Sequence, residues 1–375
     1  MSTELFINRE EFEKIRRKFG APIAGDLLLT SVGTLGSPYV VRKSEEFYFK
    51  DGNLTWFRNF KNLYSHYLYY WLQSPQGKAE LQKCTIGSSQ SAYTIVLLKG
   101  MDIVLPPLET QRKIAAILSS YDDLIENNSR RIQILEEMAR GLYREWFVNF
   151  RFPGFEDVEM VDSSLGRIPV GWKIQTVAQT IEIIGGGTPS RAVEEYWSEG
   201  DVNWYTPSDL TSAKAVFMNS SSEKITRLGL AKSSARMFPP NCVMMTSRAT
   251  IGVVAINTSD ATTNQGFIIM KPNDLLPLYT LYFWVKENVP QFINKATGTI
   301  FKEISRGTFK AIEFVLPPVN LTQAFEVSIQ FTCGQIHNLS RKNQNLRRTR
   351  DILLPKLISG EVDVSQLEVA GVIVP

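Results

Sequence analysis

Apolar residues recur at a seven-residue spacing in two long stretches of the chain. Steps of four and three residues connect Ile114, Leu118, Tyr121, Ile125, Asn128, Ile132, Leu135, Ala139, Leu142 and Trp146, and then Phe325, Ile329, Thr332, Ile336, Leu339, Asn343, Leu346, Arg350, Leu353 and Leu357. This spacing keeps one narrow stripe facing a partner helix. It predicts helices over about 110–147 and 321–358.

The two helices are expected to pair as an antiparallel coiled coil, although each stripe can instead pack on its own globular domain. Polar residues interrupt both stripes. Asn128 and Asn343 either lie buried and set the register of the pair, or lie at the wet edge of the stripe.

The two helical stretches belong to an internal repeat. Val104-Leu105-Pro106-Pro107 recurs as Val315-Leu316-Pro317-Pro318, an offset of 315 − 104 = 211 residues. Upstream, Thr30-Ser31 and Gly36 match Thr246-Ser247 and Gly252 at an offset of 216. The conserved order over more than 100 residues indicates a duplicated unit, a domain followed by a long helix.

Short β-branched and apolar runs separate turn-rich segments in the rest of the chain. They predict strands at Leu27–Thr30, Tyr39–Val41, Thr94–Leu98, Ile181–Ile184, Cys242–Thr246, Gly252–Ile256, Phe267–Met270 and Ile312–Val315, and helices near Leu63–Gln73 and Leu278–Asn288. The fold class is therefore α+β. We expect two globular domains, residues 1–104 and 151–316, each followed by a spacer helix, within residues 105–150 and 317–375.

The composition is that of a folded protein with a mild charge. Hydrophobic residues make up 43% and charged residues 21%, and the net charge is +3, so any nucleic-acid surface must be local. The second helical stretch has a net charge of 6 − 2 = +4, which exceeds that of the whole chain, whereas the first is neutral. Cys84, Cys242 and Cys333 are far apart, which favours a reducing cytoplasm. No apolar run approaches the ~18 residues of a membrane span.

Motifs for catalysis are missing. The sequence has no GxxxxGK[ST] phosphate loop, no Pro-Pro tetrapeptide of the kind amino-methyltransferases use, and no GxSxG elbow. Its two histidines, His66 and His337, are far apart and favour neither a metal site nor a catalytic pair. The run Gly185-Gly186-Gly187 predicts a tight turn with positive φ rather than a nucleotide loop. The chain is therefore interpreted as a binding protein.

Polar loops in the second domain are the candidate binding residues. Arg, Asn and Gln side chains can bond bidentately to guanine or adenine edges, and small hydroxyl residues can hold phosphates. By residue type and loop position, the candidate DNA-binding residues are Thr188, Ser190, Arg191, Ser247, Arg248, Asn264, Gln265, Gly298 and Thr299. Such loops can equally be simple turns.

Taken together, these features resemble the specificity (S) subunit of Type I restriction–modification systems. The resemblance rests on 105-LPPLETQRKI-114, 122-DDLIENN-128, 146-WFVNFRFPG-154, 166-GRIPVGW-172, 187-GTPS-190, 204-WYTPSDL-210 and 354-LPKLISG-360. The order of these motifs is more specific than any one of them, and they cover nearly the whole chain.

The resemblance implies a non-catalytic subunit that reads a bipartite site on double-stranded DNA. Each target-recognition domain would read one half-site, and the spacer helices would set the distance between them. Two modification subunits would bring S-adenosylmethionine and methylate adenine, and restriction subunits would bring ATP and Mg. No cofactor is expected in this chain itself.

One departure from the family pattern affects the first domain. Met1 corresponds to about residue 212, whereas the second domain begins near Gly166, so about 46 residues have no counterpart. There is no first-domain equivalent of Gly171-Trp172-Lys173 or Gly187-Thr188-Pro189-Ser190. An alternative function is therefore a truncated S-like protein that binds modification subunits as a regulatory or scaffold element without specifying a full site.

Overall fold

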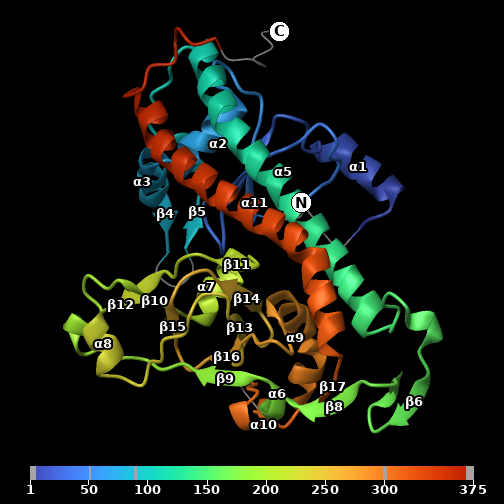
Figure 1. Cartoon of the computed structure of the whole chain (residues 1–375). Helices are drawn as coiled ribbons and strands as arrows, with labels where there is room; N and C mark the ends of the chain where they lie inside the picture. Colours follow the sequence, from blue (N-terminus) through green and yellow to red (C-terminus); the bar gives the residue numbers. More distant parts are fainter. Residues whose placement is uncertain (1–5, 50–51, 88–90, 299–301, 369–375) are drawn as a thin grey trace. The chain divides into compact units, whose positions relative to one another are not determined.

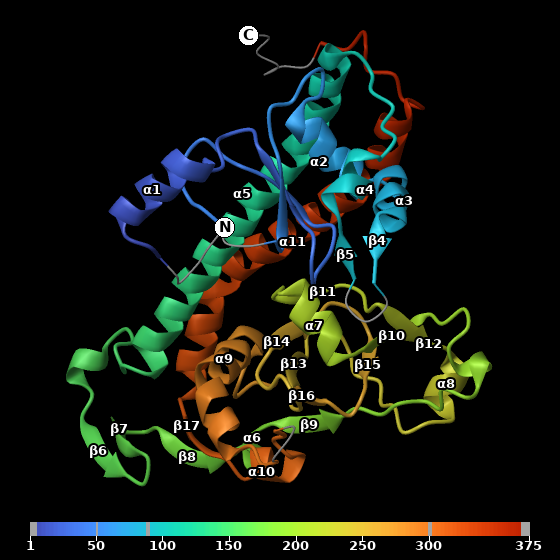
Figure 2. The same cartoon turned by 180° about the vertical axis from the view of Figure 1, so that it is seen from behind.

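The computed structural model describes residues 6–49, 52–87, 91–298 and 302–368. The chain divides into two compact units (Figures 1 and 2). The first unit consists of residues 1–127 and 343–375, and the second unit consists of residues 128–342. Because both long helices cross these boundaries, each helix contributes one part to each unit.

The long helices form where the apolar stripes predict them. Helix α5 spans Leu108–Phe147 and helix α11 spans Val319–Ser359, and every stripe residue is buried or half-buried. In the second unit the Phe325 ring lies 5.6, 5.7 and 5.1 Å from those of Tyr143, Trp146 and Phe147. In the first unit Arg350 forms an ion pair with Asp122. The two helices therefore run antiparallel within each unit, and their superhelical winding stays a prediction.

Of the two stripe asparagines, Asn343 is buried. Its side-chain Nδ2 donates a hydrogen bond to the Ile125 carbonyl oxygen at 3.3 Å. Asn128 is half-buried. Asn343 therefore occupies the buried position and not the solvent-exposed edge of the stripe.

The first unit contains a three-stranded antiparallel sheet in the order β2-β1-β3. Its elements are α1 (Arg9–Phe19), β1 (Leu27–Thr30), β2 (Pro38–Val40), β3 (Leu54–Phe57), α2 (Ser65–Gln73), α3 (Pro75–Lys83), β4 (Thr85–Ile86), β5 (Ala92–Tyr93) and α4 (Ile95–Lys99). The core of this unit includes Leu27, Trp71 and Leu118, together with Leu357 and Val364 from the end of the chain.

The second unit contains a five-stranded sheet in the order β11-β14-β13-β16-β9 and a three-stranded sheet in the order β12-β10-β15. Helix α9 packs on strands β13 and β14 (Figure 1). The elements are η1 (Phe155–Asp157), β6 (Met160–Ser163), β7 (Gly166–Pro169), β8 (Lys173–Thr176), α6 (Val177–Thr180), β9 (Glu182–Gly185), η2 (Glu194–Tyr196), β10 (Val202–Tyr205), α7 (Pro207–Ala213), β11 (Phe217–Met218), β12 (Glu223–Ile225), α8 (Arg227–Ala231), β13 (Val243–Thr246), β14 (Val254–Asn257), β15 (Ala261–Thr263), β16 (Phe267–Lys271), α9 (Leu278–Lys295), α10 (Arg306–Lys310) and β17 (Glu313–Leu316).

The internal repeat is present at the level of structure. Strand β1 pairs antiparallel with β2 and β3, and β13 pairs antiparallel with β14 and β16. The short helices α4 and α10 begin 306 − 95 = 211 residues apart, and so do the long helices, at 319 − 108 = 211. The α+β repeat predicted from the sequence is therefore confirmed.

Two local expectations are wrong. Residues 95–99 form helix α4 rather than a strand, because the Thr94 hydroxyl accepts a hydrogen bond from the Leu97 N–H and caps a helical turn. The run Gly185–Gly187 has no positive φ. Instead, a Cβ on Gly186 would lie 1.9 Å from the Asn264 carbonyl oxygen, so this run is required for close approach of another backbone segment.

One strand pair of the second unit has no counterpart among the described residues of the first unit. In the second unit β17 pairs antiparallel with β8. The segment that corresponds to β17 is residues 102–105, where Val104 is 88% exposed. Within the described residues this segment belongs to no sheet.

Helix α9 begins at a half-buried carboxylate on α11, that of Glu326. The Tyr279 and Thr280 N–H groups donate to Glu326 at 3.1 and 3.2 Å, but burial raises the pKa of this carboxyl above its ordinary value of 4.5. A raised folded-state pKa gives stability that is complete below the unfolded pKa and lost as pH rises through the folded pKa.

We therefore expect Glu326→Gln to gain thermal stability relative to the wild type as pH rises from 4 to 8. Glutamine keeps one acceptor oxygen for the α9 backbone but carries no charge to desolvate. The melting temperatures of both proteins at the two pH values test this. An equal difference at pH 4 and pH 8 would contradict it, and Glu313→Gln, on the exposed start of β17, is the control.

Candidate nucleic-acid interface

The turn between β15 and β16 carries two of the candidate residues. Asn264 is half-buried, and its Oδ1 accepts a hydrogen bond from the Gly266 N–H at 2.9 Å, which fixes the turn. The Asn264 N–H donates to the Tyr205 carbonyl oxygen at 3.1 Å and ties the turn to β10. Gln265 at the tip is exposed. The hydrogen-bonded turn thus presents the Gln265 side chain to solvent.

The glycine-rich segment after β9 lies beside this turn. The Gly187 N–H donates to the Thr263 carbonyl oxygen at 2.8 Å, and the Thr188 hydroxyl donates to Gln265 Oε1 at 2.8 Å. This bond leaves the Gln265 NH₂ group available as a donor. Thr188 and Gln265 are 77 residues apart in sequence and form one unit in space.

The end of β13 adds a cation to the same surface. The Ser247 N–H donates to the Gly266 carbonyl oxygen at 2.8 Å, while Arg248 is exposed and lies 2.8 Å from Glu303. Glu303 also forms a β-bridge with Thr297, which brings exposed Gly298 to this edge. Ser247 itself is buried at 2% exposure, so its hydroxyl is not a surface group. Thr299 lies outside the described residues.

Ser190 and Arg191 lie in a separate cluster. Arg191 Nη1 lies 2.6 Å from Glu223, and its guanidinium stacks 3.7 Å from the centre of the Trp197 ring. Trp197 Nε1 donates to the Ser190 carbonyl oxygen at 3.1 Å. Arg191 is therefore held by an acid and two tryptophans, Trp197 and Trp204, rather than projecting freely.

Two cations that the sequence analysis did not select belong to the edge around Arg248. Lys302 and Arg306 are exposed, and the Lys302 carbonyl oxygen accepts from the Ala249 N–H at 3.1 Å. The Arg306 guanidinium lies over Gly185, where a Cβ would come within 1.9 Å of it. The signal in the sequence that could have found them is the pair of basic residues at the two ends of 302-KEISR-306, which begins five residues after Thr297. Together with Arg248 they supply positive charge suited to phosphates.

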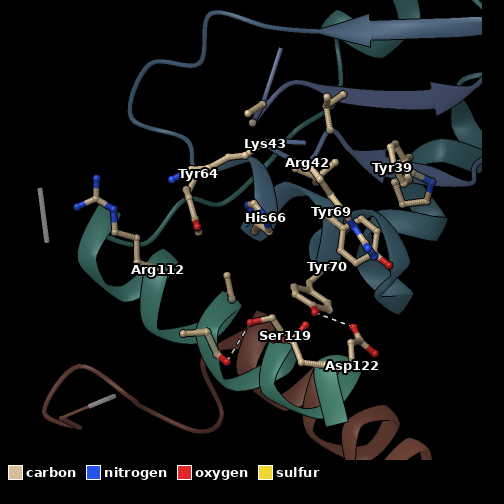
Figure 3. A pocket seen from close by; sticks show the side chains of 18 of the residues that line it. Tyr39, Arg42, Lys43, Tyr64, His66, Tyr69, Tyr70, Arg112, Ser119 and Asp122 are labelled. Atoms are coloured by element: carbon tan, nitrogen blue, oxygen red, sulfur yellow. Dashed lines mark hydrogen bonds between the residues drawn. The ribbon is translucent and has the colours of Figure 1, made fainter. Parts of the chain in front are cut away.

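The first unit holds a cavity of a different character (Figure 3). It has a volume of about 960 Å³ and is lined by Tyr39, Tyr64, Tyr69, Tyr70, His66 and small residues of α5. Some of its charged groups are paired: Arg42 lies 3.2 Å from Glu126, and the Tyr70 hydroxyl donates to Asp122 at 2.7 Å. Burial lowers the pKa of His66, so its ring is neutral at pH 7. This cavity therefore combines aromatic surface with charged groups of both signs, among them Lys43, Arg112 and Asp123.

Chemistry for metal binding or thiol catalysis is not visible in the described part of the chain. Among the described residues, no group of three or more His, Cys, Asp or Glu residues could hold a metal. Burial raises the pKa of the Cys242 and Cys333 thiols to about 11 and about 12, so both are protonated at pH 7. No helix among the same residues is long and apolar enough to cross a membrane.

Comparison with known proteins identifies relatives of the whole architecture. A family model described as the Type I restriction modification DNA specificity domain matches residues 6–137 and 169–348. The MjaIX specificity subunit of Methanocaldococcus jannaschii is 30% identical over 205 residues, which cover 54% of this chain but only 46% of that relative. The HindI specificity subunit of Haemophilus influenzae is 23% identical over 71% of this chain and 70% of its own length.

A solved structure shares the fold. The S subunit of a Type I restriction–modification system from M. genitalium superimposes with a TM-score of 0.55 at 14% identity, and covers 91% of this chain and 84% of its own. At this identity the likeness concerns the fold alone.

Proposed function

Because this chain belongs to the Type I restriction modification DNA specificity domain family, we propose that it is a DNA-recognition subunit that directs partner subunits to a bipartite site. The observation that carries this proposal is the rigid polar edge of the second unit. There Thr188, Gln265 and Arg248 are held by β9, β15–β16 and β13, three neighbouring parts of one domain.

The proposed division of labour follows from the chemistry of this edge. Arg248, Lys302 and Arg306 would contact phosphates and fix the orientation on the duplex. Gln265 and Asn264 would face base edges in the major groove, where amides pair with adenine. Arg248 forms an ion pair with Glu303, so a DNA phosphate would compete with the Glu303 carboxylate for the Arg248 guanidinium.

The remaining activities would belong to partners. We propose that two modification subunits supply S-adenosylmethionine and adenine methylation, and that restriction subunits supply ATP- and Mg-dependent cleavage. This chain would contribute no catalytic group and would work in the cytoplasm.

Methylation mapping of cells that carry the system tests the function. We expect one defined two-part motif to be methylated, and the purified complex to prefer that motif at a salt concentration that suppresses non-specific binding. Binding without sequence preference under those conditions would contradict the proposal.

A second function is favoured by the exposed segment 102–105 of the first unit. If this unit cannot read a half-site, the chain would act as a regulatory or scaffold element that binds modification subunits without specifying a full site. In that case no two-part motif would be methylated, while the complex with the modification subunit would still form.

For Gln265→Ala we expect site-specific DNA affinity to fall roughly 10-fold, because a base contact of this kind contributes about 1–3 kcal/mol. Non-specific binding and folding should be unchanged, since the Gln265 side chain is exposed. Fluorescence anisotropy with specific and scrambled duplexes measures both. Gln323→Ala, an exposed glutamine on α11, is the matched control. Equal losses on both duplexes would argue against base readout by Gln265.

A further inference from the structure

The cavity of the first unit lies along one face of helix α5 (Figure 3). Arg112, Ala116, Ser119 and Asp123 line it at spacings of four, three and four residues, so they share that face of the helix. The other walls come from β2, from the two residues after it and from the first half of α2. A volume of about 960 Å³ is in the range of cavities that hold small molecules.

The second unit has different side chains at the corresponding positions of its long helix. At the offset of 211 residues Glu326 corresponds to Ala115, and Glu326 accepts hydrogen bonds from the first N–H groups of α9 at 3.1 and 3.2 Å. At the same offset His337 corresponds to Glu126, and the His337 ring stacks on the Phe217 ring at 4.6 Å. The repeated fold therefore does not itself require the cavity of the first unit.

Helix α2 of the first unit corresponds to α9 of the second, because an offset of 213 residues aligns 69-YYW-71 with 282-YFW-284. The first N–H groups of α9 donate to Glu326, whereas the N-cap residue of α2, Tyr64, provides no side-chain cap. The start of α2 carries partial positive charge and lines the cavity together with the methyl group of Ala115. The first unit thus has room for an anion where the second unit has a carboxylate.

Two cations line the same side of the cavity. Figure 3 shows Lys43 and Arg112 on the side where Tyr64 lies, away from Asp122. Among the described residues, neither Lys43 nor Arg112 takes part in an ion pair. A guanidinium group and an ammonium group beside the start of a helix are suited to a phosphate.

Tyrosine rings form another wall of the cavity, and contacts within the first unit hold them in place. The hydroxyl groups of Tyr39 and Tyr70 donate to Glu45 and Asp122, respectively. Tyr69 packs edge-on against Tyr70, with the ring centres 4.9 Å apart. Fixed aromatic rings of this kind provide flat surfaces on which a nucleobase can stack.

We propose that this cavity binds a free nucleoside monophosphate. The phosphate would lie between Lys43 and Arg112 at the start of α2, where it would take the place of the carboxylate that Glu326 supplies in the second unit. The base would lie against Tyr39 and Tyr69. The cationic side and the aromatic wall of the cavity thus match the two parts of this ligand.

The cavity is distinct from the part of the first unit that corresponds to the proposed DNA edge. At the offset of 216 residues Ser31, directly after β1, corresponds to Ser247. The cavity is lined by Gly25, which precedes β1, and by Arg42, which comes after β2. Because β1 and β2 are antiparallel, the cavity reaches the end of this strand pair that is opposite Ser31. A bound nucleotide would therefore leave the segment around Ser31 free.

Isothermal titration calorimetry of the full chain with AMP, GMP, CMP and UMP tests the site. We expect at least one of the four to bind, and we expect its nucleoside and inorganic phosphate each to bind roughly 10-fold more weakly, because each lacks one part of the contacts. No binding of any of the four overturns the proposal, and so does equal binding of inorganic phosphate or of the nucleoside.

A DNA duplex added to the titration distinguishes the two possible sources of a nucleotide. We expect the affinity for the monophosphate to be unchanged, since the cavity would hold a free nucleotide. Loss of nucleotide binding in the presence of the duplex would assign the cavity to a nucleic-acid strand and would overturn the proposal. The titration without DNA needs no partner subunit, so its result is independent of the proposed DNA recognition.

Two variants test the position of the phosphate. Ala115→Glu gives the first unit the residue that the second unit has there, so the new carboxylate should occupy the start of α2 and weaken nucleotide binding by roughly 10-fold or more. Arg112→Ala should weaken it roughly 10-fold without adding a buried charge, and it keeps the test decisive if Ala115→Glu does not fold. Arg130→Ala, exposed on the same helix, is the control and should bind like the wild type. Wild-type affinity in a folded Ala115→Glu or Arg112→Ala variant overturns the proposal.

Discussion

Replacing Phe325 with alanine is expected to lower the free energy of unfolding by about 3–5 kcal/mol. Phe325 is fully buried where the end of α5 meets the start of α11, and its ring contacts Tyr143, Trp146, Phe147 and Phe283. Truncation would remove the apolar surface and leave a cavity between rigid aromatic rings that cannot collapse into it. A urea titration that follows tryptophan fluorescence measures the loss.

Phe331→Ala is the matched control for this experiment. It makes the same substitution six residues later on the same helix, at a side chain that is mostly exposed. We expect a change in the free energy of unfolding within about 0.5 kcal/mol. Similar losses in the two variants would show that the aromatic cluster does not anchor the helix pair.

The second large effect is expected from Gly186→Ala. The added Cβ would lie 1.9 Å from the Asn264 carbonyl oxygen and 2.5 Å from that of Thr263, and neither backbone atom can move without moving the β15–β16 turn. We expect a loss of about 1–3 kcal/mol in stability. Site-specific DNA binding should fall further than stability alone explains, because the turn that presents Gln265 would be displaced.

Gly307→Ala separates this steric effect from the general effect of adding a methyl group. Gly307 lies in α10 of the same unit, and the nearest atom to an added Cβ would be 3.7 Å away. The stability of the Gly307→Ala variant should be equal to that of the wild type or slightly higher. Wild-type DNA affinity in Gly186→Ala would refute the role of this close approach.

The sequence predicts the long helices to within a few residues because their stripe is sustained over many turns. Expected limits of 110 and 147 compare with Leu108 and Phe147, and Gly360 follows the end of α11 at Ser359 with φ +79°. The repeat predicts the shared sheet order, since homologous segments fold alike. A short apolar run such as 95–99 carries no such periodicity, so the cap at Thr94 decides it locally.

The sequence predicts which loops carry the candidate site, but it does not predict how these loops are arranged in space. Residue type singles out Gln265 and Arg248, yet the pairing of Thr188 with Gln265 depends on how β9 and β16 lie side by side. Arg191 looks equally suitable in sequence, and only the fold places it against Glu223 and Trp197. The close approach at Gly186 is likewise a property of the tertiary structure.

The first unit is built from two stretches that are far apart in the sequence, which has a consequence for synthesis on the ribosome. This unit needs residues 1–127 and residues from 343 onward, so its core cannot close until the last part of the chain has emerged. At roughly 5–20 residues per second, the intervening segment takes roughly 10–40 s to translate. During that time Leu118 and Trp71 cannot pack against Leu357 and Val364, which belong to the same core. The second unit, continuous in sequence, can fold first, and the nascent first unit is the part that most needs a chaperone.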